Sequence, residues 1–359
     1  MPHWPWQQFA ENRRLQRLSR QPRGAILCYH RVFQTETDPM LLCVSPRRFE
    51  QQLIYLKKNY RPLSLSQLVS DRQENQLADR SIALTFDDGY TDNLLHALPL
   101  LEKYQVPATV FVCSGQIDSP HEYWWDELER ILLGDISQHW PQSIQVPIKH
   151  LKRTWQIRCD QDEQPNPQEK NWDVTQPFTP SLRHLAYREI HAILLACNHT
   201  QQSHAIASIC RQLHTPTAGR PQNLAMRAEQ LVQLAKSPYI QIGAHTINHP
   251  QLSALSDQDQ THEIQQSQAD LQNIIKQEVS SFSYPYGGSL DYTPMTTQII
   301  RDLGFKYACA NIPGIITAAQ KPVPIDPFQL PRFLVRNWDQ ETFAQHLSQM
   351  FMTPSRVAA

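Results

Sequence analysis

Short apolar runs alternate along this chain with longer segments in which apolar residues recur every three or four positions. The short runs predict buried strands, at residues 25–29, 82–86, 109–113, 240–244, 281–284, 306–310 and 333–335. The longer segments predict amphipathic helices, over 49–56, 94–101 and 257–278. Repeated strand–helix units are typical of an α/β fold with a parallel sheet, and closing such a sheet gives a (β/α) barrel.

This alternation is interrupted in the middle of the chain. A Trp-rich helix is predicted over 123–133, and a Pro- and Gln-rich stretch of irregular backbone then runs to about Pro180. Two helical patterns follow, over 182–213 and 224–235. Because the segment is too long for a plain loop, we interpret it as a helical insertion. The predicted organisation is an N-terminal tail, a first barrel part, the insertion, a second barrel part and a C-terminal tail, at 1–24, 25–118, 119–238, 239–345 and 346–359.

Several reactive side chains follow directly after predicted strands. They are His30, Asp87, Asp88, His245, His249 and Tyr286. In a parallel barrel the carboxyl ends of the strands meet at one face, and catalytic residues collect there. We therefore expect one shared site at that face. The insertion leaves after one strand end and returns before another, so we expect it to stand near the rim of the site.

The pattern of these residues favours a metal site. Two adjacent carboxylates, Asp87 and Asp88, repel each other, and a divalent cation is a common compensation in hydrolytic sites. His245 and His249 are four residues apart, so both imidazoles can lie on one side of a tight turn. Two neutral nitrogens and one carboxylate from Asp88 leave positions open for water and substrate, as in catalytic sites. The histidine pair alone would be better interpreted as structural, but the neighbouring Asp-Asp-Gly strand end favours a metal.

Composition narrows the classes of function. The chain has 33 Lys and Arg against 34 Asp and Glu, a net charge of -1 that argues against nucleic-acid binding. Its 7 cysteines form no CxxC pair, which suggests buried reduced thiols and a cytoplasmic protein. No apolar stretch is long enough to cross a membrane. Trp4, Trp6 and Phe9 precede several arginines, a pattern that fits either weak association with a membrane surface or a tail helix packed on the domain. The sequence leaves the oligomeric state open.

The strand-end residues resemble the motifs of the polysaccharide deacetylases of the NodB-homology type, carbohydrate esterase family 4. The matching segments are Thr85-Phe86-Asp87-Asp88-Gly89, His245-Thr246-Ile247-Asn248-His249-Pro250 and Phe282-Ser283-Tyr284-Pro285-Tyr286-Gly287. The resemblance covers residues 25–118 and 238–336 and leaves out the insertion. It implies a distorted (β/α) barrel with fewer than eight strands. It also implies a divalent ion, in the first place Zn²⁺, on Asp88, His245 and His249, with Asp87 as the general base.

Two departures from the family pattern bear on the mechanism. Many members carry, in the third motif, an arginine that orients the base, whereas this chain has Ser283, so Arg332 or Arg336 is a candidate replacement. The C-terminal Leu-x-His motif that supplies a general acid is missing, and His346 matches it poorly. The segment Tyr29-His30-Arg31-Val32 instead resembles the Tyr-His-x-Val of a branch with permuted barrel elements, which implies that His30 is the acid. The alternative for His30 is a structural strand-end histidine.

The resemblance implies a metal-dependent hydrolase that removes an N-acetyl group from an amino sugar of a polysaccharide, an oligosaccharide or a lipid-linked glycan precursor. A backbone N–H near Pro285 and Tyr286 would stabilise the oxyanion. Trp125 is a candidate for stacking on a sugar ring, whereas the helical face shared by Trp124 favours a core position.

Other functions stay open at this point. Removal of an O-acetyl or N-formyl group would use the same site. A non-haem iron oxygenase also uses two histidines and a carboxylate, although such enzymes usually have a double-stranded β-helix rather than alternating strands and helices. A catalytically silent glycan-binding protein is conceivable because the third-motif arginine is missing. Release of amine from an N-acetylated oligosaccharide would separate the last class from the hydrolase.

Overall fold

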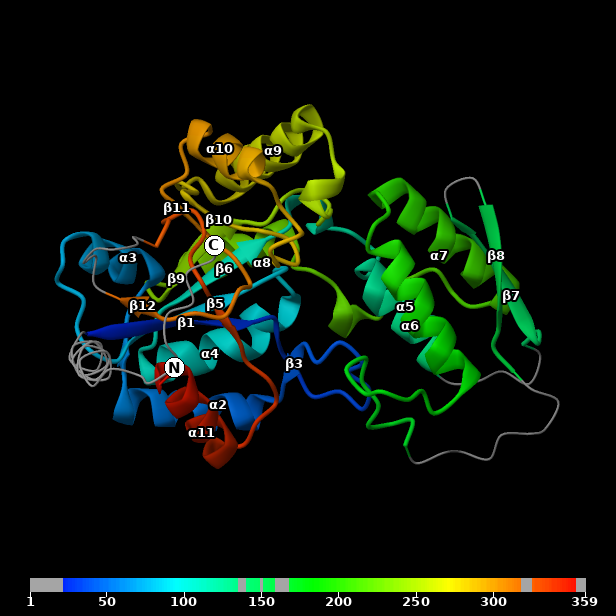
Figure 1. Ribbon diagram of the computed structural model, residues 1–359, viewed down its shortest axis with the longest axis horizontal. Helices are drawn as coiled ribbons and strands as arrows, with labels where there is room; N and C mark the ends of the chain where they lie inside the picture. The colour runs from blue at the N-terminus through cyan, green and yellow to red at the C-terminus, as the bar shows by residue number, and fades with distance from the viewer. Residues whose placement is uncertain (1–21, 135–139, 149–150, 159–167, 318–324, 353–359) are drawn as a thin grey trace, which may run out of the picture.

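The computed structural model describes residues 22–134, 140–148, 151–158, 168–317 and 325–352. Figure 1 shows two parts side by side, an α/β part and a smaller, mainly helical part. None of the described helices is long and apolar enough to cross a membrane. The predicted membrane-surface segment around Trp4 and Trp6 lies outside the described residues, as does most of the predicted tail 1–24.

A nine-stranded sheet forms the centre of the α/β part. Its main strands run in the spatial order β11-β10-β9-β6-β5-β1, and every neighbouring pair in this series is parallel. Their bounds are Tyr307–Cys309 for β11, Ser281–Ser283 for β10, Ile240–Ala244 for β9, Ala108–Val112 for β6, Ser81–Phe86 for β5 and Arg23–Tyr29 for β1. The predicted strands therefore exist, within about two residues at each end.

Shorter strands complete the sheet. β13 (Phe333–Leu334) pairs in parallel with β1, β4 (Arg61–Pro62) pairs in parallel with β5, and β12 (Ile316–Thr317) is antiparallel to β1. Just before β13, Leu330 forms a parallel bridge to Cys309 of β11. The segment from Leu330 to β13 thus connects the two ends of the series, β11 and β1, and curls the sheet into a distorted barrel. This confirms the predicted fold class.

Helices cover the outside of the barrel. Their bounds are Pro46–Asn59 for α2, Leu65–Gln73 for α3, Leu98–Tyr104 for α4, Ala228–Ala235 for α8, Asp257–Ile275 for α9, Pro294–Asp302 for α10 and Gln340–Met352 for α11. Local sequence fixes several of the starts. Ser45 accepts a hydrogen bond from the Arg48 amide ahead of Pro46, and Ser256 accepts one from the Asp259 amide. The predicted helix 94–101 is a π turn at Asn93–Ala97 followed by α4.

The smaller part is the insertion, and it has a hydrophobic core of its own. It contains α5 (Trp124–Leu133), β7 (Ser143–Ile148), β8 (Leu151–Gln156), α6 (Leu182–Leu194) and α7 (His199–Leu213). The prediction of irregular backbone to Pro180 is wrong for β7 and β8, which form an antiparallel hairpin. Every second residue of β7 is buried, at Ile144, Val146 and Ile148. This alternation is typical of a strand, but the Gln- and Pro-rich composition around it resembles irregular backbone.

Three predicted boundaries need correction. The single helical pattern 182–213 is two helices, because Asn198 and Gln201 form a capping box that starts α7. α8 was predicted as part of the insertion, but its Leu231 and Leu234 pack in the core of the barrel. The predicted C-terminal tail from 346 begins inside α11, where Leu347 is fully buried against the barrel. The apolar faces of α8 and α11 thus both pack against the barrel.

Candidate active site

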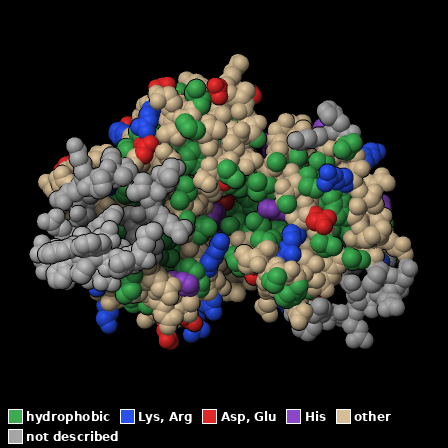
Figure 2. Space-filling model, in the orientation of Figure 1, with side chains coloured by type: hydrophobic (Ala, Val, Ile, Leu, Met, Phe, Trp, Pro, Cys, Tyr) green, Lys and Arg blue, Asp and Glu red, His purple; other side chains and the backbone are tan. Residues whose placement is uncertain are grey.

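The carboxyl ends of four parallel strands bring the predicted residues together. His30 follows β1, Asp87 and Asp88 follow β5, His245 and His249 follow β9, and Tyr286 follows β10. They line one cavity of about 80 Å³, together with Met40, Leu42, Trp125, His191 and Asn311. Figure 2 shows a hollow between the barrel and the insertion, with apolar, histidine and acidic side chains around it. The predicted convergence at one face of the barrel is thus present.

Asp88 and two imidazoles form the centre of the cavity. Asp88 Oδ1 lies 3.5 Å from His245 Nε2 and 3.5 Å from His249 Nε2. This oxygen is buried and has no hydrogen-bond donor among the described residues. His245 Nδ1 lies 2.7 Å from the backbone oxygen of Ser283, so Nδ1 carries the hydrogen and the lone pair of Nε2 faces Asp88. Burial lowers the pKa of His249 to about 3, which keeps its imidazole neutral.

These residues fit a divalent cation. An unsatisfied buried carboxylate oxygen is costly, and a cation between it and two imidazole nitrogens removes that cost. One oxygen and two nitrogens at these separations can hold a divalent cation and leave coordination positions open. The Cys113 sulfur lies within 4.8 Å of ligand atoms of Asp88 and His245, but the thiol donates to the His245 carbonyl at 3.1 Å and burial raises its pKa, so it stays a protonated neighbour of the site. The sequence gives no signal for Cys113 at this place, since a cysteine in an apolar strand is usually a core residue.

The backbone around the site adopts conformations that L-residues rarely take. Positive φ angles occur at Asp88 (73°), Thr246 (66°), His249 (55°) and Tyr286 (59°). Such conformations cost about 1 kcal/mol or more each and persist only where surrounding contacts enforce them. For the histidine loop, those contacts come from Glu263 of α9. Its carboxylate accepts hydrogen bonds from the amides of residues 247 and 248 at 2.9 Å each and from the Asn248 side chain at 2.8 Å.

Asp87 lies in a different environment from its neighbour. Arg332 donates from Nη1 to Asp87 Oδ1 at 2.8 Å and from Nη2 to Oδ2 at 2.7 Å. The same guanidinium donates to the Ser283 hydroxyl at 2.8 Å and to Thr85 at 3.1 Å. Burial alone would raise the pKa of Asp87, but the charge of Arg332 outweighs it and holds the pKa well below its usual range.

Of the two candidate arginines, Arg332 therefore takes the place beside Ser283, while Arg336 binds the backbone oxygen of Leu41. Arg332 is not placed to contact substrate directly. It is fully buried behind Asp87, so it can act on substrate only through that carboxylate. Pro285 is likewise buried, and it lies outside the cavity lining, whereas the next residue, Tyr286, faces the cavity.

His30 lies beside Asp87. Its ring nitrogen, the Cys28 sulfur and an Asp87 carboxylate oxygen lie within 4.8 Å of one another. Desolvation lowers the pKa of His30, and the charges of Asp88 and Asp87 oppose that shift. His30 thus lines the same cavity as Asp87 and lies next to it. His346, the weaker candidate, lies on α11 and stacks on Trp338 at a ring distance of 4.0 Å.

The insertion supplies one wall of the cavity. The Trp125 ring packs edge to face on His249 at 4.9 Å, and its Nε1 donates to the Tyr90 hydroxyl at 2.9 Å. His191 of α6 also lines the cavity. His191 cannot be recognised from the sequence, because a histidine inside an amphipathic helix gives no signal of its own. Trp124 packs in the hydrophobic core of the insertion, as favoured, and it also lines a second cavity beside the active site.

The fold and site define a class, a parallel α/β barrel with a histidine–carboxylate site at the carboxyl ends of its strands. A family model described as polysaccharide deacetylase matches residues 74–139 and 181–308, which is more than half of the chain. The chain belongs to the polysaccharide deacetylase family. The double-stranded β-helix of the alternative iron oxygenases is a different architecture.

Individual relatives agree with this family. YxkH of Bacillus subtilis is 30% identical over 129 residues, 35% of this chain and 43% of that protein. The poly-β-1,6-N-acetyl-D-glucosamine N-deacetylase of Escherichia coli K12 is 28% identical over 96 residues, 26% of this chain and 14% of that enzyme. The chain thus spans less than half of the length of these curated relatives. The solved Streptococcus pyogenes deacetylase PplD, in complex with acetate, has a TM-score of 0.54 at 20% identity and covers 93% of this chain and 100% of its own, which shows the shared fold.

Proposed function

We propose that this protein is a divalent-metal-dependent hydrolase that removes the N-acetyl group from an amino sugar of a glycan. The observation that carries the proposal is the contrast between two adjacent buried carboxylates. Asp88 faces two imidazole nitrogens without a hydrogen bond to its Oδ1, while Asp87 is held by Arg332. Relatives named poly-β-1,6-N-acetyl-D-glucosamine N-deacetylase support an acetylated amino sugar as substrate.

Asp88, His245 and His249 would hold the cation, and Zn²⁺ suits this donor set best. When bound, such an ion supplies Lewis acidity and lowers the pKa of a coordinated water. Asp87 acts as the general base that takes the proton of the attacking water. Arg332 donates to both Asp87 oxygens and keeps the carboxylate ionised; Oδ2 also accepts from the Ser283 hydroxyl, so the second lone pair of Oδ1 is the one left for the proton.

The remaining steps concern the carbonyl oxygen and the departing amine. The backbone N–H of Tyr286 has no acceptor among the described residues and is free to stabilise the oxyanion. An amine leaves poorly unless it is protonated, and His30, within 4.8 Å of Asp87, delivers that proton. Water and amide thus give acetate and a free amino sugar. Trp125 forms the wall against which the sugar ring packs.

Purified protein loaded with Zn²⁺ tests this function. It is incubated with N-acetylglucosamine oligomers and with nucleotide-linked and lipid-linked N-acetylated sugars, and products are analysed by mass spectrometry and amine labelling. We expect the loss of one acetyl unit with a new free amine. Acetyl loss without a new amine would instead indicate an esterase, and binding without turnover would indicate a silent glycan-binding protein.

Variants assign the roles. Asp87→Asn abolishes turnover and retains the metal, whereas His245→Ala loses both, and His262→Ala, an exposed histidine of α9, is the matched control that loses neither. Full metal content in His245→Ala would contradict the ligand assignment.

We also propose that the protein works in the cytoplasm on a glycan precursor. Five described cysteines, Cys28, Cys43, Cys113, Cys210 and Cys309, are buried free thiols, which suits a reducing compartment. Cell fractionation tests the location, and recovery of the protein outside the cytoplasm would refute it.

A further inference from the structure

A second cavity, of about 290 Å³, lies between the barrel and the insertion. Tyr123 and Trp124 at the start of α5 line one side, and Asn248 of the histidine loop lines another. The next residues along the chain, Trp125 and His249, line the active-site cavity. The two cavities are therefore neighbours that share the same two segments as walls. Nothing in the proposed deacetylation reaction uses the second one.

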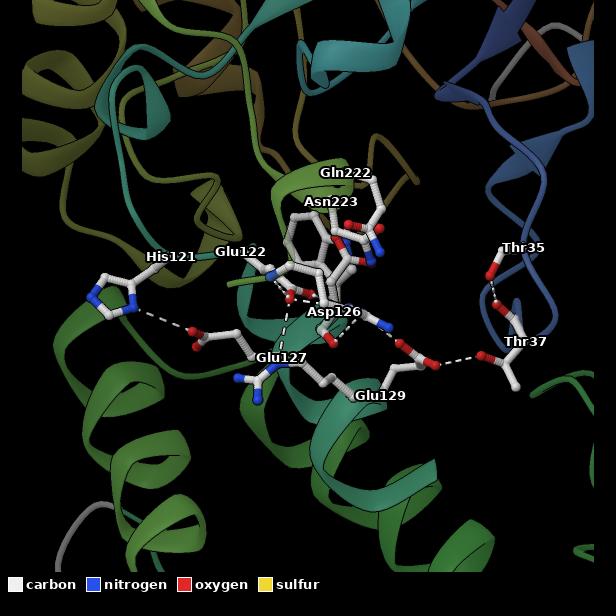
Figure 3. A network of polar contacts seen from close by, with 12 residues as sticks. Thr35, Thr37, His121, Glu122, Asp126, Glu127, Glu129, Gln222 and Asn223 are labelled. Atoms are coloured by element: carbon white, nitrogen blue, oxygen red, sulfur yellow. Dashed lines mark hydrogen bonds and ion pairs between the residues drawn. The ribbon is translucent and has the colours of Figure 1, made fainter. Parts of the chain in front are cut away.

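Acidic side chains gather beside this cavity, and most of them are already paired. Glu122 contacts Arg220 at 2.8 Å and Arg130 at 3.3 Å. Glu129 contacts Arg220 at 2.7 Å. The Tyr90 hydroxyl donates to Asp126 at 2.6 Å. Figure 3 shows Glu122, Asp126 and Glu129 within one network of contacts that also reaches Thr37. These three carboxylates serve to hold α5 in place.

Glu127 differs from them. In Figure 3 its carboxylate points away from the other acids, toward His121. That imidazole, at 3.4 Å, is its one ion-pair partner among the described residues, and its ring is largely exposed. Glu127 itself is only 8% exposed and lines the second cavity. Burial raises the pKa of Glu127, and the charges of His121 and Arg130 oppose that shift. A largely buried carboxylate with one weak partner thus faces open space, where a cation would find an acceptor that is already oriented.

We propose that this cavity binds a protonated amino sugar, with its ammonium group donating to Glu127 and its ring lying against Tyr123 and Trp124. Carbohydrate sites combine aromatic walls with a few polar groups in this way. His199 and Ser203 of α7, which also line the cavity, offer partners for ring hydroxyls. The inference rests on the proposed function, because N-deacetylation produces this type of cationic unit. The second cavity is thus a binding site for the product form of the sugar, beside the site that makes it.

Calorimetry with glucosamine and its oligomers tests the proposal without any turnover, since these ligands carry no acetyl group. We expect the wild-type protein to bind them at neutral pH. Glu127→Gln, which keeps the shape and removes the charge, should weaken binding about tenfold or more. Ala207→Phe fills the cavity from α7 and should abolish binding. Glu229→Gln, an exposed carboxylate of α8, is the matched control and should bind as the wild type does.

Ligand length identifies the source of the amino sugar. Affinity that rises with oligomer length, as one glycan spans both cavities, indicates another unit of the same chain, whereas equal affinity at all lengths indicates a separate saccharide. Either result supports the site. Equal binding by wild type and Glu127→Gln, or binding that survives Ala207→Phe, would overturn it.

If the proposed N-deacetylase function is wrong but the amino-sugar site is real, the experiments give a distinguishable result. In that case, acetylated oligomers are not turned over, while glucosamine binding still depends on Glu127. Thermal melting of each variant confirms that the protein is folded.

Discussion

Replacement of Arg332 by methionine tests the arrangement of the base. Methionine has a similar length but removes the charge and every hydrogen bond to Asp87, Ser283, Thr85 and the Ala310 carbonyl. Asp87 would stay buried with only weak contacts, from the Ser283 hydroxyl at 3.3 Å and the Cys28 thiol at 3.6 Å. Breaking a buried ion pair by removing one partner costs about 3–5 kcal/mol. We expect the free energy of unfolding at pH 7 to fall by that amount.

The same substitution should lower kcat by about 100-fold or more, because an unanchored base loses both its position and its ionisation. Urea unfolding followed by circular dichroism measures the first effect, and amine release at saturating substrate measures the second. Arg332→Lys keeps the charge but loses the paired hydrogen bonds. Its stability and its kcat should therefore lie between those of the wild type and those of Arg332→Met.

A charge-swap variant separates the role of the charge from its place in the chain. Ser283 is the position at which many members of the family carry the arginine, and its hydroxyl lies 2.8 Å from Arg332 Nη2. We therefore expect Ser283→Arg combined with Arg332→Ser to recover part of the stability and of the activity. Wild-type stability and turnover in Arg332→Met would refute this reasoning, because a buried Asp87 charge without a partner must lower both.

Three further predictions concern groups around the site. Glu263→Gln loses part of the acceptor that holds the histidine loop, so zinc affinity should fall about 10-fold to 100-fold, while Glu278→Gln, an exposed carboxylate, leaves it unchanged in the same titration. Burial raises the pKa of Asp126 to about 7, so the folded state holds a proton between pH 4 and 7 that the unfolded state releases, and the stability of the wild type falls with rising pH in that window. Asp126→Asn should remove this dependence, which amounts to a change of about 2 kcal/mol in the free energy of unfolding between pH 4 and pH 7 after allowance for partial exposure. Parallel pH profiles of stability for the two proteins would contradict this prediction. Gly243→Ala places a Cβ 2.3 Å from the Phe111 ring in the strand that carries His245, so it should destabilise the protein by about 1–3 kcal/mol, and an unchanged melting temperature would show that the strand can shift.

The sequence predicts the barrel strands well, because each is a short apolar run followed by a polar strand end. Asp87, Asp88, His245 and His249 could be placed at one face for the same reason, since the carboxyl ends of parallel strands converge. The choice between Arg332 and Arg336 could not be made, because two arginines four residues apart are equivalent in sequence and only the register of β13 against β1 decides which faces Asp87.

The insertion was harder to predict. The hairpin of β7 and β8 lies in a Pro- and Gln-rich composition that resembles irregular backbone, although Ile144 and Val146 alternate as strand residues do. The wall residues Trp125 and His191 come from helices that reach the site only through tertiary packing. Local periodicity indicates that these helices exist but does not indicate which side chain faces a neighbouring part of the molecule.

The position of bound zinc tests the central claim most directly. Crystals of the Zn²⁺-loaded protein, measured at the zinc absorption edge, locate the ion by its anomalous scattering. We predict one strong peak in contact with Asp88 Oδ1, His245 Nε2 and His249 Nε2, with Asp87 alongside but not coordinated. A peak on the neighbouring group of Cys28, His30 and Asp87, or a peak without His249, would contradict the account, because the base or the acid would then be a ligand or the ligand set would be wrong.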